Sequence, residues 1–235
     1  MKISKLLSDL AYGELANLAV LNETGNSIDA KDIPKVLLGI NDGLVDLHTK
    51  FNLNMKDVIL QTQKHITFYY LLPQFAQSNT QTSTEPYQYI MDLEGEPFQD
   101  DVLRIMQVYD HSGCELPLND STKINSVFTT QTKLLQIPNA KDDEFVTVLY
   151  RAGHVPIEAG DIATGSINVP EVLQSALRCY VAYHMYGMLG TETAIFQSST
   201  YKSKYDEKCA QVVFTDAVNN SLAPTDIKFA QRGFV

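Results

Sequence analysis

The hydrophobic period of this chain changes twice, and this change constrains the fold more than any other feature of the sequence. Up to about Phe51, large aliphatic residues recur every three or four positions, as in a helix that buries one face. Between Asp57 and Arg151, β-branched and aromatic residues dominate short runs, as in strands. The helical period returns at Pro170. The chain is therefore expected to hold two helical segments separated by a β-rich insertion.

The N-terminal segment predicts two helices joined by a turn. The first is interrupted at Gly13, and its apolar face comprises Leu6, Leu7, Leu10, Leu15, Leu18 and Leu21. The second has a continuous stripe made of Ile33, Leu37, Ile40, Leu44, Leu47 and Phe51. Asp32 or Asp29 is expected to cap this helix, with Pro34 in its first turn. The two helices are expected to form an antiparallel pair.

The C-terminal segment predicts a second helical pair. Its first helix starts at Pro170, ends near Gly187 and Gly190, and has a face made of Leu173, Leu177, Tyr180, His184 and Met188. Its second helix spans about residues 193–218, with Ala194, Tyr201, Tyr205, Cys209, Val212, Val213 and Val218 as its apolar residues. A bundle of the four helices would bury all four stripes.

The middle of the chain predicts antiparallel strands. Residues 57–72 are expected to form a hairpin that turns at Gln63–His65, and further strands are expected at Val102–Tyr109, Leu134–Ile137 and Phe145–Arg151. The polar, uncharged stretch at residues 77–84 buries too little apolar area to offset its ordering entropy, so it is expected to be a mobile loop.

These patterns give an α+β fold: a mainly α-helical bundle, with two N-terminal and two C-terminal helices, a central antiparallel β insertion and an extended C-terminal arm. The expected boundaries are residues 1–54 for the first helical pair, 55–168 for the β-rich insertion, 169–218 for the second pair and 219–235 for the arm.

The charge argues against a nucleic-acid-wrapping protein, and the cysteine usage favours a reducing compartment, the cytoplasm. The net charge is −10 and the isoelectric point is about 4.9, which argues against wrapping nucleic acid. The N-terminus lacks a secretory pattern, and no apolar run is long enough to predict a membrane span. Cys114, Cys179 and Cys209 lie far apart, without a zinc-type spacing, and are interpreted as reduced thiols.

The sequence shows no readable catalytic, cofactor or metal motif. Phosphate-binding glycine loops, the HExxH and GxSxG patterns and calcium loops are all missing from it. Asp42, Asp46 and His48 form the densest acidic-plus-histidine group, but the period of the helix turns His48 away from the two aspartates. His184 is expected to be a hydrogen-bonded core histidine rather than a catalytic base. The protein is therefore expected not to be an enzyme.

The C-terminal residues form a candidate partner-binding arm. Pro224 and the Asn/Ser cluster before it end any helix, and the arm then carries Phe229, Arg232, Gly233, Phe234 and Val235. Two aromatic side chains left in water would cost about 2 kcal/mol each. Two alternatives follow: the arm folds back on its own domain, or it docks into another protein.

Several segments resemble head-to-tail adaptor proteins of tailed bacteriophages, especially the tubular adaptors (connectors) that lie beneath the portal of short-tailed phages. The resemblance covers nearly the whole chain and rests on Leu6–Leu15, Ile40–Leu44, His65–Tyr70, Asp100–Ile105, Glu115–Asp120 and Phe229–Val235. These motifs are structural rather than catalytic.

The resemblance implies a structural virion protein at the head-tail junction, made in the host cytoplasm. Such adaptors form a ring, usually of twelve copies, attached to the portal protein and leading to the tail nozzle. The helical bundle would line the channel through which genomic DNA passes during ejection, without specific binding, and the arm would reach the portal. The negative charge agrees with a conduit to which DNA does not adhere.

Two other classes remain open. One is a tail-completion protein that contacts no portal. The other is a small intracellular enzyme or ligand-binding protein whose site only the fold assembles. A deep pocket in which carboxylates converge on His154 or His184 would favour this last class.

Overall fold

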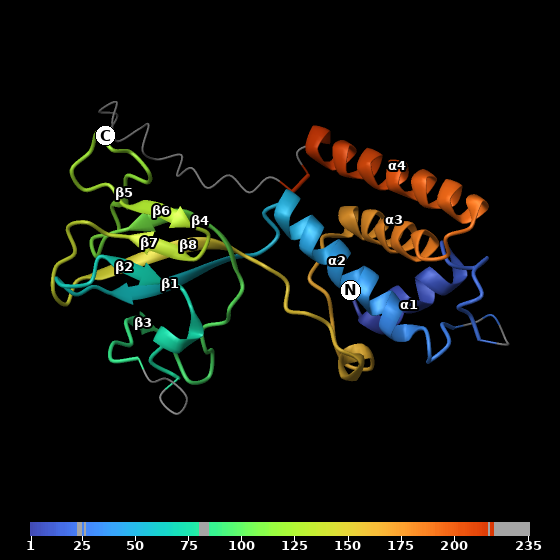
Figure 1. Cartoon of the computed structure of the whole chain (residues 1–235), viewed down its shortest axis with the longest axis horizontal. Helices are drawn as coiled ribbons and strands as arrows, with labels where there is room; N and C mark the ends of the chain where they lie inside the picture. The colour runs from blue at the N-terminus through green and yellow to red at the C-terminus, as the bar shows by residue number, and fades with distance from the viewer. Residues whose placement is uncertain (23–24, 26, 80–84, 216, 219–235) are drawn as a thin grey trace, which may run out of the picture. The chain divides into compact units, whose positions relative to one another are not determined.

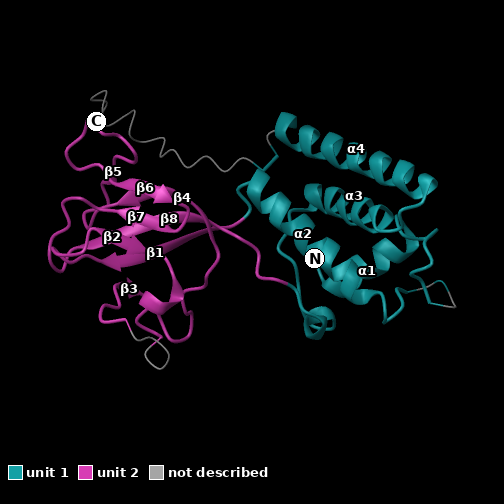
Figure 2. Ribbon diagram, viewed as in Figure 1, with its two compact units in different colours: residues 1–53, 157–235 teal, residues 54–156 magenta. Residues whose placement is uncertain are grey.

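The computed structural model describes residues 1–22, 25, 27–79, 85–215 and 217–218 (Figure 1). The chain forms two compact units (Figure 2). The helical unit comprises Met1–Leu53 and Ile157–Val235, and the β unit comprises Asn54–Pro156. The α+β fold predicted from the sequence is confirmed, with two helices before and two after a central region of antiparallel sheets. The predicted arm falls outside the described residues.

The described part of the helical unit contains four α-helices and one short 3₁₀ helix around a single hydrophobic core. The helices are α1 (Ile3–Tyr12), α2 (Ile33–Lys50), α3 (Glu171–Gly187) and α4 (Glu192–Thr215), and the 3₁₀ helix is η2 (Ala159–Ile162). Helix α3 packs against both α2 and α4 (Figure 1). The close antiparallel pairing predicted for α1 with α2 is wrong, since α2 packs mainly on α3.

Helix α1 is shorter than the leucine pattern suggested. It ends at Tyr12, where the Gly13 N–H donates to the Asp9 carbonyl oxygen. Leu15 and Leu18 are still buried, but hydrogen-bonded turns rather than a helix carry them into the core. The apolar pattern therefore identified buried residues correctly and overestimated the length of the helix.

Close approach between α2 and α3 depends on two glycines one helical turn apart. A Cβ atom added at Gly43 would lie 2.9 Å from side-chain atoms of Leu177 and Tyr180. One added at Gly39 would lie 3.1 Å from Nδ1 of His184. Since real Cβ atoms rarely tolerate such contacts, both positions suit glycine although glycine weakens a helix interior.

Neither predicted aspartate caps α2 through its side chain. Asp32 occupies the N-cap position without a side-chain capping bond, and its Oδ1 accepts a hydrogen bond from Lys35 Nζ at 2.7 Å. The backbone carbonyl of Asp29 instead accepts from the N–H groups of Asp32 and Ile33. The predicted capping is therefore wrong in its mechanism, while Pro34 lies in the first turn as expected.

The β unit contains two antiparallel sheets. The five-stranded sheet has the order β3-β1-β8-β4-β5, and the three-stranded sheet has the order β2-β7-β6. The strands are β1 (Met55–Gln61), β2 (Phe68–Tyr70), β3 (Ile90–Met91), β4 (Val102–Tyr109), β5 (Glu115–Leu116), β6 (Phe128–Gln131), β7 (Leu134–Gln136) and β8 (Phe145–Ala152). A second hydrophobic core lies within this unit. Strands β4, β7 and β8 match their predicted segments closely.

The hairpin predicted for residues 57–72 is wrong. The expected turn occurs near Lys64, but β1 pairs with β3 and β8, whereas β2 pairs with β7 of the other sheet. The hydroxyl of Tyr69 accepts from the Gln63 N–H and donates to the Gln63 carbonyl oxygen, which fixes the crossing between sheets. Alternation predicts a strand, but it does not identify the partner of that strand.

The segment after the β unit packs with the helices. Ile157 and Ile167 belong to the helical core, and the Met1 ammonium group donates to the Ile167 carbonyl oxygen at 2.7 Å. Of the loop predicted at residues 77–84, only Gln77, Ser78 and Asn79 are described, so most of that prediction falls outside the described residues.

Candidate interaction surfaces

The predicted docking arm, with Phe229, Arg232, Gly233, Phe234 and Val235, lies wholly outside the described residues. The docking and fold-back alternatives for the arm therefore both stay predictions. Among the described residues, three candidate interaction surfaces are a helical tip, a groove beside α4 and one face of the five-stranded sheet.

The acidic-plus-histidine group on α2 does not converge on one point. Asp42 approaches His184, with 3.6 Å between Oδ2 and Nε2, whereas Asp46 accepts a hydrogen bond from the Tyr205 hydroxyl. His48 is only 2% exposed and points into the helical unit. Within the described ranges, no group of three or more His, Cys, Asp or Glu side chains is arranged to hold a metal ion.

His184 differs from the core histidine that the sequence predicted. Its side chain is 22% exposed and lies at the contact between α2 and α3, where Nε2 approaches Asp42. Nδ1 is buried and has no hydrogen-bond partner among the described residues. The residue is therefore half-buried beside Asp42 rather than in the core, because the apolar face of α3 is rotated toward Ala176, Ala182 and Met185.

The loop between α3 and α4, with the first turn of α4, forms an exposed apolar tip. Met188, Leu189, Ile195 and Phe196 are 48%, 52%, 57% and 68% exposed. Residues 187–197 contain no Lys or Arg and one acidic residue. The helical pattern predicts Met188 on a buried face, which is wrong because α3 ends at Gly187 and Gly190 adopts a φ of 65° to turn the chain. Such a cluster of large apolar side chains indicates a protein-contact surface.

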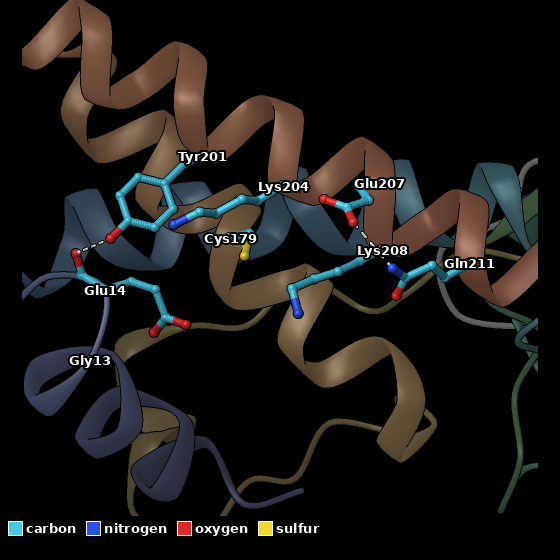
Figure 3. A pocket seen from close by; sticks show the side chains of 8 residues that line it. All are labelled: Gly13, Glu14, Cys179, Tyr201, Lys204, Glu207, Lys208 and Gln211. Atoms are coloured by element: carbon cyan, nitrogen blue, oxygen red, sulfur yellow. Dashed lines mark hydrogen bonds between the residues drawn. The ribbon is translucent and has the colours of Figure 1, made fainter.

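A groove of about 500 Å³ lies where the end of α1 meets α3 and α4 (Figure 3). Its lining consists of Gly13, Glu14, Cys179, Tyr201, Lys204, Glu207, Lys208 and Gln211. The Tyr201 hydroxyl donates to the Glu14 carbonyl oxygen at 3.4 Å, and Lys204 Nζ lies 5.0 Å from the centre of the Tyr201 ring. Outside the lining, Arg178 Nε donates to Glu14 Oε1 at 3.2 Å. These contacts tie the turn after α1 to α3 and α4.

The groove does not offer an activated nucleophile. Burial raises the pKa of the Cys179 thiol, so the thiol stays protonated and unreactive at neutral pH. Burial likewise raises the pKa of the Tyr201 hydroxyl. We therefore interpret the groove as a polar seam between helices rather than as a reaction centre.

The outer face of the five-stranded sheet carries an apolar hollow. Strand register places Met91, Ile59, Thr147 and Tyr109 in one row across β3, β1, β8 and β4. Phe145 lies beside this row, and the turn at Asp110, His111 and Gly113 completes a hollow of about 570 Å³. Ile59, Met91 and Phe145 are 39%, 38% and 42% exposed. Both faces of β1 and β8 carry large side chains. The outer face of the sheet therefore differs from the polar, solvent-exposed face that antiparallel sheets commonly have.

The same face carries two arginines directly opposite each other. Arg104 of β4 and Arg151 of β8 are register partners, and they are the two arginines of the β unit. Burial, followed by the charge of Arg104, lowers the pKa of Arg151. The two side chains therefore bring like charges to neighbouring strands of the outer face.

The chain matches no protein-family model and no curated protein sequence. Among the described residues, no helix is long and apolar enough to cross a lipid bilayer.

The sequence did not predict the helical tip or the apolar face of the sheet as interaction surfaces. The one signal for the tip was the absence of charged residues other than Glu192 around Met188 and Phe196.

Proposed function

We propose that this protein is a structural head-to-tail adaptor of a tailed bacteriophage. Copies of the chain would form a ring, of twelve copies by the family resemblance, that attaches to the portal and connects it to the tail nozzle. Genomic DNA would pass through the ring without specific binding, in keeping with the net charge of −10. The ring would belong to the virion, at the head-tail junction.

The observation that carries the proposal is the exposed apolar tip between α3 and α4, taken together with the resemblance. Met188, Leu189, Ile195 and Phe196 would bury about 400 Å² of apolar side chain if covered, since large side chains bury about 150–250 Å² each when fully enclosed. Covering this area would contribute about 10 kcal/mol before the cost of association. An assembly protein has a use for such a surface, whereas a monomer gains nothing from it.

The alternatives have less support. Neither hollow described above is lined by His154 or His184, and the groove thiol is held protonated. The described residues therefore give no specific support for an enzyme or a ligand-binding protein. A tail-completion protein without portal contact would use the same apolar tip, and only a binding experiment separates it from the adaptor.

Deletion of the arm tests the portal contact. The full chain and a chain ending at Ala223 are each mixed with purified portal rings, and the mass of the complex is measured. We expect a stoichiometric complex with the full chain only, because loss of even one buried aromatic anchor costs about 2 kcal/mol or more. The melting temperature should be nearly unchanged, because the deletion lies beyond α4. A truncated chain that melts several degrees lower yet still binds portal would show that the arm folds back.

A substitution in the tip tests assembly separately. Phe196→Glu should reduce the number of copies bound to each portal ring at least tenfold. The melting temperature should stay unchanged, because Phe196 is 68% exposed. Gln197→Glu is the matched control, since it adds the same charge one position away. If neither the full chain nor the control ever forms a stoichiometric portal complex, the adaptor proposal fails.

A further inference from the structure

Two apolar surfaces among the described residues differ in shape. The exposed apolar tip projects from the turn between α3 and α4, at one end of that helical pair (Figure 1). The apolar hollow is a depression on the outer face of the five-stranded sheet, lined by side chains of β1, β3, β4 and β8. Its volume of about 570 Å³ is that of a pocket for a small ligand, so it suits a few large side chains but not the length of a helix.

We infer that the apolar tip of one copy of this chain seats in the apolar hollow of the next copy. The contact is heterologous, because each copy contributes two different surfaces, and a cyclic ring of more than two copies needs contacts of this kind. The inference rests on the adaptor proposal for the existence of a ring, and it names the partner of the tip. Its test uses no portal, so the two proposals can fail separately.

Low charge at both surfaces favours a second copy as the occupant of the hollow. Copies of net charge −10 repel each other, so they associate most readily where each contributes little charge. Residues 187–197, which include the tip, carry Glu192 as their single charged residue. Among the residues that line the hollow, the one carboxylate is that of Asp110, and its Oδ1 already accepts hydrogen bonds from the N–H groups of Ser112 and Cys114. Added salt should therefore strengthen the contact, because it screens the repulsion between copies.

The area of the contact suits a ring rather than a free dimer. Seating the tip would remove about 400 Å² of surface from each copy, or about 800 Å² in total. Stable protein complexes bury about 1,200–2,000 Å² in total. The free chain is therefore expected to associate only weakly, whereas copies held side by side would form the contact at a high effective concentration.

Cross-linking between two single-site cysteine proteins tests the contact. Thr193→Cys marks the tip and Thr147→Cys marks the hollow, each combined with Cys114→Ser because Cys114 is the exposed native cysteine. The two proteins are mixed at millimolar concentration with a short bis-maleimide, and mass spectrometry counts the linked pairs. We expect tip-to-hollow links to exceed tip-to-tip and hollow-to-hollow links by about tenfold or more, and to increase with salt. Thr132→Cys is the matched control for the hollow, since Thr132 is an exposed threonine of the same unit that does not line it.

A mixture of two blocked variants tests the head-to-tail direction. Phe196→Glu blocks the tip and Met91→Glu blocks the hollow, so each variant alone should stay monomeric at a concentration at which the unmodified chain associates. Their equimolar mixture should form dimers and no larger species, because the intact hollow of the first variant accepts the intact tip of the second. Sedimentation measures these masses. Gln197→Glu and Tyr87→Glu add the same charge at exposed positions that belong to neither apolar surface, and both should associate like the unmodified chain.

Several results would overturn the inference. A predominance of tip-to-tip links would identify a symmetric dimer of tips. Equal linking of the tip to Thr132→Cys and to Thr147→Cys would identify random collision, and a mixture of blocked variants that stays monomeric would exclude the head-to-tail contact. A portal complex that forms without any tip-to-hollow link would remove this inference and leave the adaptor proposal standing. Tip-to-hollow links without any portal complex would support this contact while the adaptor proposal fails.

Discussion

Asn41 and Ile157 exchange two hydrogen bonds although 116 positions separate them in the sequence. The Asn41 amide donates to the Ile157 carbonyl oxygen at 3.1 Å, and the Ile157 N–H donates to Asn41 Oδ1 at 2.9 Å. Ile157 is 7% exposed and is the first residue of the chain after the β unit. One side chain of α2 thus fixes the point at which the chain returns to the helical unit.

The first prediction concerns this pair. Asn41→Ala should lower the free energy of unfolding of the helical unit by about 2–3 kcal/mol, because it leaves a buried N–H and a buried carbonyl of Ile157 unpaired. Asn41→Asp retains the acceptor and should cost less. Urea unfolding followed by circular dichroism at 222 nm measures both. Equal stability of all three proteins would mean that water replaces the amide without loss.

The second prediction concerns the contact between α2 and α3. Gly43→Val should destabilise the helical unit by about 1–3 kcal/mol, because the new side chain meets Leu177 and Tyr180 in a packed contact. Gly160→Ala is the control, since a Cβ atom there meets nothing within 4 Å. Thermal unfolding measures the stability of the two variants. A Gly43→Val protein as stable as the control would show that α3 can move away from α2 without loss of stability.

The third prediction concerns the cysteines. In the folded protein only exposed Cys114 should react quickly with iodoacetamide, whereas Cys179 and Cys209 should react only after unfolding. Both side chains are buried, so the reagent has little access to their sulfur atoms. Burial also raises the pKa of each thiol, so the thiolate fraction is small. Mass spectrometry counts the adducts, and Cys114→Ser should show none under native conditions. A second fast adduct in the native protein would contradict the packing of α3 on α4.

The fourth prediction concerns alkaline stability. Burial, together with the hydrogen bond to Asp46, raises the pKa of the Tyr205 hydroxyl above its unfolded value near 10. A raised pKa in the folded state means that the folded protein binds the proton more tightly. Its contribution to stability is therefore complete below about pH 10 and declines as the pH rises further.

A single variant isolates this contribution. Tyr205→Phe should be less stable at neutral pH, because it loses the bond to Asp46, but its stability should fall less steeply above about pH 10. Urea midpoints measured from about pH 8 to about pH 11 give both slopes. Parallel slopes for the two proteins would show that Tyr205 does not control the alkaline transition.

The sequence by itself determined the type of most elements. Residues such as Leu37, Ile40, Leu44 and Leu47 recur at the period of a helix, and this period is a local property that survives in any tertiary arrangement. Strands β4, β7 and β8 were found for the same reason, because alternation and β-branched residues are local signals. The burial of Leu15 and Leu18 also followed from the sequence, although their helix did not.

Only the tertiary structure decided the partners of these elements and the surfaces they leave uncovered. The separation of β1 from β2, the packing of α2 on α3 and the return of the chain at Ile157 all depend on contacts between residues distant in sequence. The juxtaposition of Arg104 with Arg151 arises in the same way, since it requires the register of β4 on β8. Periodicity fixes which face of an element is apolar, whereas the partner that covers this face is selected by the packing of the whole chain.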